Sequence, residues 1–406
     1  MKKNWSVFQM VVLVVFVALG IYITHQLLRY AGWGWIGFLA TIFWITFVFA
    51  IALSQPLYFW GNESLSDSIW VERLNVVGYL AFPYVSDLLV MILLRDLIGF
   101  AAWGGFLFQW WDWDGYSLYS ATWTILSLFL PLLLLGLGYL TVWLGPFVHH
   151  VKVRDPRLPK EFEGFRIAHL SDIHMGPMMT DRLIDRMLRK LRREKYDALV
   201  MTGDIVDCDP VMYRERLWGL RELEAPEGVY YCTGNHEYYW GFEKVRPVFD
   251  GTKIQVLQNE TAYLNRGGQQ LSFTGLPDPV SRFFPKARAF NWDEISPASD
   301  GEYRVLLAHQ PYLADEAVHK GFQLQLSGHT HAGQFFPWNF LILFFQKYSK
   351  GLYRIKKDKC GKKGLQDLWL YVNQGTGFWG PPTRLGTYGE ITILELTRGE
   401  DSKPKV

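Results

Sequence analysis

The chain contains no aspartate, glutamate, lysine or arginine between Arg29 and Glu63. A helix that crosses a bilayer needs about 20 mostly apolar residues, and the segment 33–53 inside this stretch meets that need. Other apolar segments of the first 150 residues lie at 8–24, 74–94 and 121–144. A soluble domain would have to bury several long helices that lack a polar face. The sequence therefore predicts an all-α transmembrane region at residues 1–150.

The basic residues that flank this region predict its orientation. Cytoplasmic flanks of membrane spans carry an excess of lysine and arginine. Lys2 and Lys3 precede the first segment, and four basic residues follow the last one: Lys152, Arg154, Arg157 and Lys160. Both flanks lie on one side only if the number of spans is even. We therefore expect a multi-pass protein of the cell membrane with four spans and a cytoplasmic C-terminal domain.

One part of this region leaves the number of spans open. Pro83 and Asp87 interrupt the third apolar segment, and the segment 97–111 is apolar but short and rich in glycine. That segment can extend the third span or lie in the membrane interface. An additional span there would place the C-terminal domain on the opposite side of the membrane.

Charge and cysteine content exclude several classes of protein. The formal net charge of the chain is +2, so no overall basic field favours nucleic acid as a partner. The basic run 186–193 lies in an amphipathic helix expected at 180–194, with Thr180 as its N-cap, and we interpret the run as a solvated helix face. The three cysteines are far apart, which excludes a disulfide framework and a zinc ribbon.

In the rest of the chain, polar residues repeatedly follow short apolar runs that we expect to form buried strands. These residues are Asp172 and His174 after 167–170, Asp204 after 198–202, Asn235 and His236 after 228–233, His309 after 305–308, and His329 and His331 after 323–326. Open α/β sheets place their ligand sites at the carboxyl ends of strands. The sequence therefore predicts an α/β domain in which these side chains converge.

The residue types point to metal chemistry. Imidazole suits zinc, iron and manganese, and carboxylate and amide oxygens also bind divalent cations. Two such cations need a bridging carboxylate, and Asp204 is the best candidate because it follows both a strand and a glycine. Such a pair lowers the pKa of a shared water and stabilises in-line displacement at phosphorus. His236 would act as general acid, whereas Asp207 and Glu237 either orient ligand histidines or cap the next helix.

Five short motifs occur in a characteristic order: 172–174, 203–207, 234–237, His309 and 328–331. Together they resemble the calcineurin-like metallophosphoesterases over roughly residues 165–397. The resemblance implies a four-layer sandwich, with two mixed β-sheets flanked by helices, and two divalent metal ions (manganese, iron or zinc). It implies one ligand set of Asp172, His174, Asp204 and His331, a second of Asp204, Asn235, His309 and His329, and a catalytic His236. The expected organisation is a transmembrane region (1–150), a linker (151–164), the phosphoesterase domain (165–397) and a tail (398–406).

The motifs 308–311, 328–334, 373–377 and 383–386 narrow the resemblance. They look like the bacterial membrane-associated branch that includes UDP-2,3-diacylglucosamine hydrolase-like members. Ala332 stands where that branch usually has glycine, and Phe378 and Trp379 occupy a loop that is usually smaller. These departures affect the expected substrate and leave the expected metal ligands intact.

The expected reaction is hydrolysis of a phosphodiester, a phosphomonoester or a pyrophosphate by a hydroxide that bridges the two metals. The aromatic run 335–345 either belongs to the core or forms an apolar lip at the membrane interface. A lip would favour a lipid-linked substrate and contact with membrane lipids, with Trp338 and Tyr348 at the level of the headgroups. The alternative function is a membrane receptor, scaffold or transporter with an inactive phosphoesterase fold, but only Asp87 is a clear ionisable group within the predicted spans.

Overall fold

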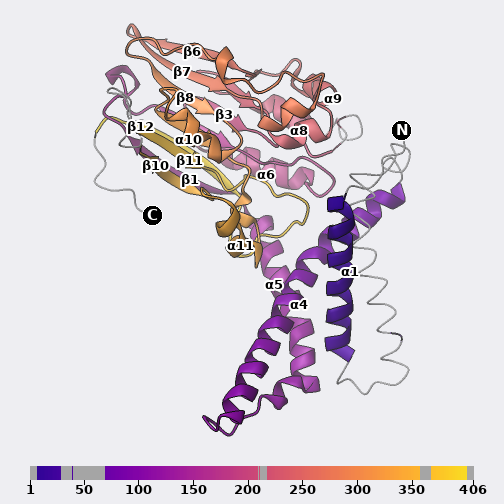
Figure 1. The fold of residues 1–406 in the computed structure, drawn as a ribbon. Helices are drawn as coiled ribbons and strands as arrows, with labels where there is room; N and C mark the ends of the chain where they lie inside the picture. The colour runs from indigo at the N-terminus through magenta and orange to yellow at the C-terminus, as the bar shows by residue number, and fades with distance from the viewer. Residues whose placement is uncertain are drawn as a thin grey trace. The chain divides into compact units, whose positions relative to one another are not determined.

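The computed structural model describes residues 7–28, 39, 69–208, 210, 217–356 and 367–399. The chain divides into two compact units, Met1–Gly138 and Tyr139–Val406. Figure 1 shows long helices in the first unit and the strands with short helices in the second. The boundary falls inside one helix, α5, and the predicted span at 33–53 lies almost entirely outside the described residues.

The first unit contains the helices α1 (Val7–Leu28), α4 (Ile69–Leu107) and most of α5 (Ala121–Leu144), with a 3-10 helix at Tyr116–Tyr119. Among the described helices, two are long and apolar enough to cross a membrane, over Val76–Leu107 and Thr122–Leu144. Pro83 lies inside α4, and residues 97–107 continue the same helix. The short apolar segment therefore extends the third predicted span up to Leu107.

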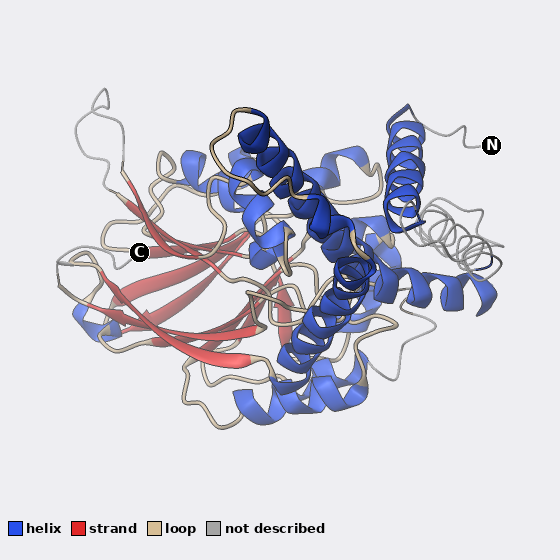
Figure 2. Cartoon of the chain, turned by 90° about the horizontal axis from the view of Figure 1, so that it is seen from below, coloured by secondary structure: helices blue, strands red, loops and turns tan. Residues whose placement is uncertain are grey.

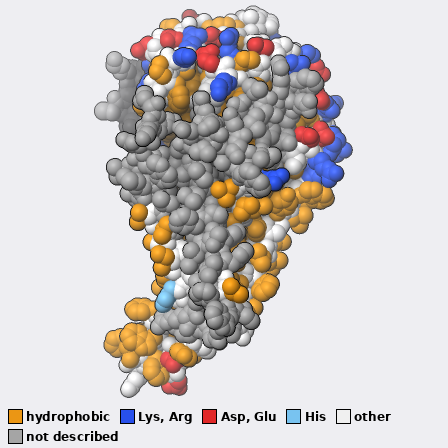
Figure 3. Space-filling model, turned by 90° about the vertical axis from the view of Figure 1, so that its right-hand side faces the viewer, with side chains coloured by type: hydrophobic (Ala, Val, Ile, Leu, Met, Phe, Trp, Pro, Cys, Tyr) orange, Lys and Arg blue, Asp and Glu red, His pale blue; other side chains and the backbone are white. Residues whose placement is uncertain are grey.

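Polar and apolar side chains of this unit are distributed as a lipid environment requires. Large hydrophobic side chains of α4 and α5 are exposed, and Figure 3 shows hydrophobic side chains on this surface. Asp87 and Arg95 of α4 are buried, and Arg95 donates to the side chains of Gln26 (2.9 Å) and Asp96 (2.9 Å). Ionisable groups within membrane helices usually face other protein groups in this way.

The second unit contains two six-stranded sheets, and both are mixed (Figure 2). The first has the order β1 (Phe147–Arg154), β12 (Glu390–Thr397), β2 (Arg166–Leu170), β3 (Ala198–Thr202), β4 (Val229–Cys232), β5 (Ile254–Val256). The second has the order β10 (Gly351–Ile355), β11 (Leu368–Val372), β9 (Leu324–Ser327), β8 (Tyr303–Leu307), β7 (Gln269–Gly275), β6 (Glu260–Arg266). In the first sheet only β12 and β2 pair antiparallel, and in the second only β10 with β11 and β6 with β7.

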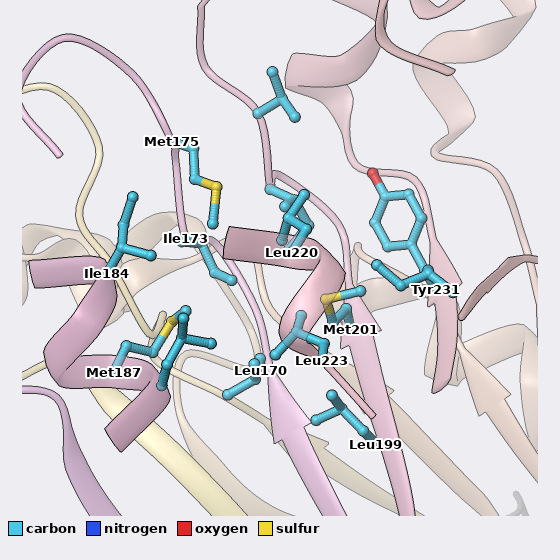
Figure 4. Packing of buried hydrophobic residues seen from close by; sticks show 14 of the residues in the cluster. Leu170, Ile173, Met175, Ile184, Met187, Leu199, Met201, Leu220, Leu223 and Tyr231 are labelled. Atoms are coloured by element: carbon cyan, nitrogen blue, oxygen red, sulfur yellow. The ribbon is translucent and has the colours of Figure 1, made fainter. Parts of the chain in front are cut away.

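Three buried clusters hold the layers of the second unit together. Side chains of β2, β3 and β4 meet those of β7, β8 and β9 in a core between the sheets. On the outer face of the first sheet, α6 (Asp181–Leu191) packs Ile184 and Met187 against Leu170 and Met201 (Figure 4). Helix α10 (Ala314–Ala317) covers the outer face of the second sheet. The predicted sandwich of two mixed sheets flanked by helices is confirmed.

Some local expectations differ from the structure. Strand β1 begins at Phe147 and pairs along its whole length with β12, so residues 147–154 belong to the sheet where the sequence suggested the end of the transmembrane region and a linker. Thr180 occupies the N-cap position of α6, but its side chain makes no capping hydrogen bond. A 3-10 helix, Trp218–Glu222, precedes β4.

The remaining short helices lie in loops at the ends of the strands. They are α8 (Asn235–Tyr239), α9 (Phe242–Val245), α11 (Trp338–Phe345) and 3-10 helices at Lys160–Phe162, Arg246–Phe249, Pro279–Phe283, Trp292–Glu294, Pro311–Leu313 and His331–Gly333. Two of them carry predicted site residues, because α8 begins at Asn235 and one 3-10 helix begins at His331.

Candidate metal centre

All eight predicted site residues follow the carboxyl ends of five strands, as the sequence predicts. The strands are β2, β3 and β4 of the first sheet and β8 and β9 of the second. Within each sheet these strands run parallel, so their carboxyl ends lie along one edge. The side chains that they bring together are Asp172, His174, Asp204, Asn235, His236, His309, His329 and His331.

The backbone of this edge is strained at the candidate ligands. Asp172, His174 and Asp204 have φ angles of 51°, 50° and 51°, and His329 and His331 have 71° and 48°. Residues other than glycine rarely adopt this left-handed conformation, and such strain gathers at functional sites. Ala332 has φ 51°, so the alanine that replaces the expected glycine adopts a conformation that glycine would tolerate more easily.

The first donor group consists of Asp172, His174 and His331. The Nε2 atoms of the two histidines are 3.0 Å apart, and His331 Nε2 lies 3.4 Å from Asp172 Oδ1. The other carboxylate oxygen, Oδ2, accepts from the Ser171 hydroxyl (2.5 Å) and from the backbone N–H of His329 (3.0 Å). The same N–H also lies 3.0 Å from Oδ1, so both carboxylate oxygens face the His329 backbone and Oδ1 faces the His331 imidazole as well.

The second donor group consists of Asp204, His309 and His329, with Asn235 beside them. Asp204 Oδ2 lies 3.1 Å from His309 Nε2, and Asp204 Oδ1 accepts from the backbone N–H of His236 (2.9 Å). His329 Nδ1 lies 3.2 Å from His309 Nε2 and 3.1 Å from Asn235 Oδ1. Asp204 Oδ2 also lies 3.8 Å from His174 Nε2, which places this carboxylate between the two groups.

These spacings fit divalent cations. Metal–nitrogen bonds of about 2.0–2.1 Å place neighbouring ligand atoms about 3.0 Å apart in octahedral geometry and about 3.4 Å apart in tetrahedral geometry. The contacts above are 3.0 and 3.4 Å in the first group and 3.1 to 3.2 Å in the second. Each of them joins an imidazole nitrogen to another nitrogen or to an oxygen. The donor set is therefore suited to one cation in each group, with Asp204 in reach of both.

In three histidines of the site, a neighbouring acceptor faces Nδ1 and leaves Nε2 to face the site. His309 Nδ1 donates to the Thr202 carbonyl (2.6 Å), which leaves its Nε2 for a ligand. Asp207 Oδ1 lies 2.8 Å from His236 Nδ1, and its Oδ2 lies 3.5 Å from His174 Nδ1. Of the two roles considered for Asp207, the structure favours orientation of histidines, and this carboxylate directs the Nε2 atoms of both rings toward the site.

Glu237 has a different partner set. Its carboxylate accepts from the backbone N–H groups of Asp204 (3.0 Å), Ile205 (2.7 Å) and Gly234 (2.8 Å). Gly234 is the N-cap residue of α8 and Glu237 accepts from its N–H, so helix capping is the better of its two interpretations. The other two bonds tie the loop after β3 to α8. Glu237 therefore fixes Asp204 through the backbone.

The buried histidines compensate the charge of the buried carboxylates only in part. Burial opposes charge on Asp204 and His309, but their attraction prevails: it lowers the pKa of Asp204 well below its usual value and raises the pKa of His309 well above its own. For His236, burial acts against protonation, and Asp207 and Asp204 together raise its pKa to about 9. Burial raises the pKa of Glu237. Several carboxylates buried this close together need protons or cations.

The sequence did not single out Arg384 as part of the site. This arginine is 1% exposed, and its guanidinium donates to the carbonyls of Gly375 (3.2 Å) and Gly377 (2.6 Å). Its Nη2 lies 3.2 Å from His331 Nδ1. The signal was the motif 383–386, which carried part of the family resemblance without a role for the arginine. Arg384 connects the loop after β11 to the turn that carries His331.

The loop with Phe378 and Trp379 lies next to His236. Phe378 is buried, whereas Trp379 is 46% exposed and its ring lies 5.7 Å from that of His236. The Gln334 side chain holds this loop, because it donates to the carbonyls of Trp379 (3.0 Å) and Pro381 (2.9 Å) and accepts from the Trp379 N–H (2.8 Å). An indole is thus fixed beside the candidate catalytic histidine.

Residues 165–333 match the sequence model described as calcineurin-like phosphoesterase. This segment, which is less than half of the chain, is similar to that family. The phosphoesterase domain is similar to an uncharacterized metallophosphoesterase of Campylobacter jejuni, with 33% identity over 62% of this chain and 63% of the relative. A zebrafish (Danio rerio) "transmembrane protein with metallophosphoesterase domain" is 29% identical over 67% of this chain and 62% of its own length. The chain thus spans less than two thirds of the length of these relatives. An uncharacterized metallophosphoesterase of Aquifex aeolicus is 29% identical over 64% of this chain and 98% of its own length.

Among solved structures, the 5'-nucleotidase precursor of Thermus thermophilus is similar with a TM-score of 0.37 and 14% identity, over 57% of this chain and 55% of that one. The matching family and these relatives are all named for phosphoesterases. The clustered histidines and aspartates of the phosphoesterase domain form a candidate divalent metal site. The narrower resemblance to UDP-2,3-diacylglucosamine hydrolases gains no support from these comparisons.

Proposed function

We propose that the chain is a membrane-anchored phosphoric ester hydrolase that uses two divalent cations. One observation carries this proposal: two groups of nitrogen and oxygen donors lie side by side, and the Asp204 carboxylate reaches both (3.1 Å to His309 Nε2, 3.8 Å to His174 Nε2). A pair of divalent cations, when bound, supplies charge stabilisation for the phosphoryl group and a water of lowered pKa. Manganese, iron and zinc all suit the donor set.

The side chains divide the work as follows in this proposal. Asp172, His174 and His331 would hold one cation, Asn235, His309 and His329 would hold the other, and Asp204 would be shared by both. His236 lies at the edge of the donor groups, with its Nε2 3.9 Å from Asp204 Oδ2. Burial opposes protonation of His236, but Asp207 and Asp204 raise its pKa to about 9, which favours the protonated ring. His236 would donate that proton to the leaving oxygen of the substrate.

The anchor is the helical unit. Its two long apolar helices and the relatives named as transmembrane proteins support membrane association. We extend this to a multi-pass protein with four spans and a cytoplasmic phosphoesterase domain, because lysine and arginine flank the predicted spans at both ends.

The substrate in this proposal is amphiphilic, and the support comes from α11. This helix follows the turn of His331, and none of its residues is buried. Phe340 and Phe344 are 59% and 83% exposed, whereas Phe335 at the start of the run is buried. The core alternative for 335–345 therefore fits Phe335 but not the helix 338–345. Tyr348 also differs from expectation: it is buried and its hydroxyl donates to Asp315 (2.7 Å), so it does not lie at headgroup level.

A substitution at the bridging position tests the hydrolase. Asp204→Asn keeps the shape of the side chain but removes its charge. Because even partners outside the ligand sphere cost roughly 10–100-fold, hydrolysis should fall by at least about 100-fold, with loss of at least one bound metal. Purified full-length protein is assayed on phosphomonoesters, phosphodiesters and lipid pyrophosphates, with metal content measured in parallel.

The matched control is Asp293→Asn, which removes an exposed carboxylate outside the site. It should keep wild-type turnover and metal content. If the wild-type protein bound metal but hydrolysed no substrate of the panel, the inactive receptor or scaffold would become the better account. If Asp204→Asn retained full activity and full metal, the ligand assignment would be wrong.

A further inference from the structure

Helix α6 and the turn that follows it carry four basic residues that line one cavity. Arg186, Arg189 and Lys190 have the i, i+3, i+4 spacing that places side chains on one helix face, and Arg193 follows in the turn. The opposite face, with Ile184 and Met187, is buried against the first sheet (Figure 4). Packing on one side thus presents the four cations together on the other.

The last turn of α5 meets this basic face. Trp143 and Leu144 line a cavity of about 290 Å³ together with these four basic residues. The Arg186 guanidinium lies 4.7 Å from the centre of the Trp143 ring. Lys190 Nζ donates to the carbonyls of Leu144 (2.8 Å) and Pro146 (2.7 Å), so it caps the carboxyl end of α5. We call this cavity the basic pocket.

The charge of the basic pocket has little compensation within the protein. Among the described residues, Arg186, Arg189 and Arg193 form no ion pair, and the nearby Glu194 is bound to His150 (3.3 Å) instead. Arg186 Nη1 is buried and has no hydrogen-bond partner there. Burial and the adjacent Arg186 and Arg193 lower the pKa of Lys190. An anion in the basic pocket would reduce the repulsion among these cations and would accept a hydrogen bond from Arg186 Nη1.

We propose that the basic pocket binds the phosphate of an anionic phospholipid in the leaflet where α5 ends. This inference rests on the membrane part of the proposed function. The apolar segment Thr122–Leu144 ends in the wall of the basic pocket, so a membrane that accepts α5 presents its headgroups there. Arginine forks match phosphate oxygens, and clustered basic residues next to a span attract anionic lipid. Trp143 suits the interface between chain and headgroup.

Lipid binding is measured on the full-length protein in zwitterionic detergent. The probes are a short-chain phosphatidylglycerol, the matching phosphatidylcholine, inorganic phosphate and a short single-stranded oligonucleotide. The test variant is Arg189→Gln with Arg193→Gln, since Lys190 also caps α5 and its loss would disturb the fold. The control is Arg246→Gln with Lys286→Gln, which removes two exposed cations of the same unit.

We expect phosphatidylglycerol to bind more tightly than phosphatidylcholine and inorganic phosphate. At about 1 kcal/mol for each basic residue, the test variant should bind phosphatidylglycerol roughly 30-fold more weakly, while the control variant binds as wild type. Equal binding of the two lipids, equal binding by the test variant, or a preference for free phosphate or for the oligonucleotide would each overturn the inference.

Hydrolysis of a small soluble phosphodiester separates this inference from the proposed function. The basic pocket contains none of the candidate ligands, so the test variant should retain wild-type hydrolysis. A protein that binds phosphatidylglycerol as expected but hydrolyses nothing would support the basic pocket and reject the hydrolase. A protein that hydrolyses the diester but shows no lipid preference would support the hydrolase and reject lipid binding in the basic pocket.

Discussion

At the scale of single residues, Asp207 links the two histidines whose roles the proposal keeps apart. Its two oxygens face His236 Nδ1 and His174 Nδ1, so one carboxylate orients a proton donor and a ligand. Asp207, His174 and His236 also satisfy the spacing of a third donor group. Because Asp207 faces both Nδ1 atoms, we do not interpret this third set as another metal site. We interpret it as a set of contacts that orients the residues of the first two donor groups.

The role of His236 can be separated from metal binding. His236→Ala should lower the rate of hydrolysis by roughly 10²–10⁴-fold, the usual contribution of a general acid, and should keep the metal content because Asn235 is the proposed ligand. Asp207→Asn should cost less, roughly 10–100-fold, since it acts through ring orientation. Single-turnover rates and elemental analysis check both variants. Loss of metal in His236→Ala would assign that imidazole to the ligands instead.

At the scale of secondary-structure elements, the strand ends could be predicted from sequence because each signal is local. An apolar run followed by Asp, Asn or His marks the carboxyl end of a buried strand without knowledge of its neighbours. The pairing of β1 with β12 could not be predicted in this way, since it joins residues about 240 positions apart. Arg384 was missed for the same reason, because its contact with His331 spans 53 residues.

The exposure of α11 also could not be predicted from the sequence. It leads to a prediction about substrate choice. Replacement of Phe340, Leu341 and Phe344 by serine should weaken hydrolysis of a lipid phosphoester and spare a small soluble phosphodiester. These side chains are exposed, so stability should change by only about 0.5 kcal/mol for each substitution. Parallel assays of the two substrates and thermal unfolding measure these effects.

Phe283→Ser is the matched control for α11, because Phe283 is an exposed aromatic side chain outside that helix. It should leave both activities unchanged. A triple variant that loses both activities and unfolds would show that α11 supports the fold, and one that keeps both activities would remove the lipid argument.

At the scale of the whole molecule, the side of the membrane remains a prediction from charge. Lys2 and Lys3 at one flank and the basic residues 152–160 at the other place both in the cytoplasm. A reporter that is active only in the cytoplasm, fused after Val406, should give a signal, and one active only outside should not. The opposite pattern would indicate an odd number of spans.

The proposed ligands of one cation come from both sheets, since His174 follows β2 and His331 follows β9, 157 residues later. The complete site therefore cannot exist on a nascent chain until both sheets have been synthesised and have docked. Because a cation that binds only the folded state stabilises it in proportion to its availability, metal supply would act here as a late quality check on biosynthesis. A cell short of the metal would then hold a less stable protein that is more open to proteolysis.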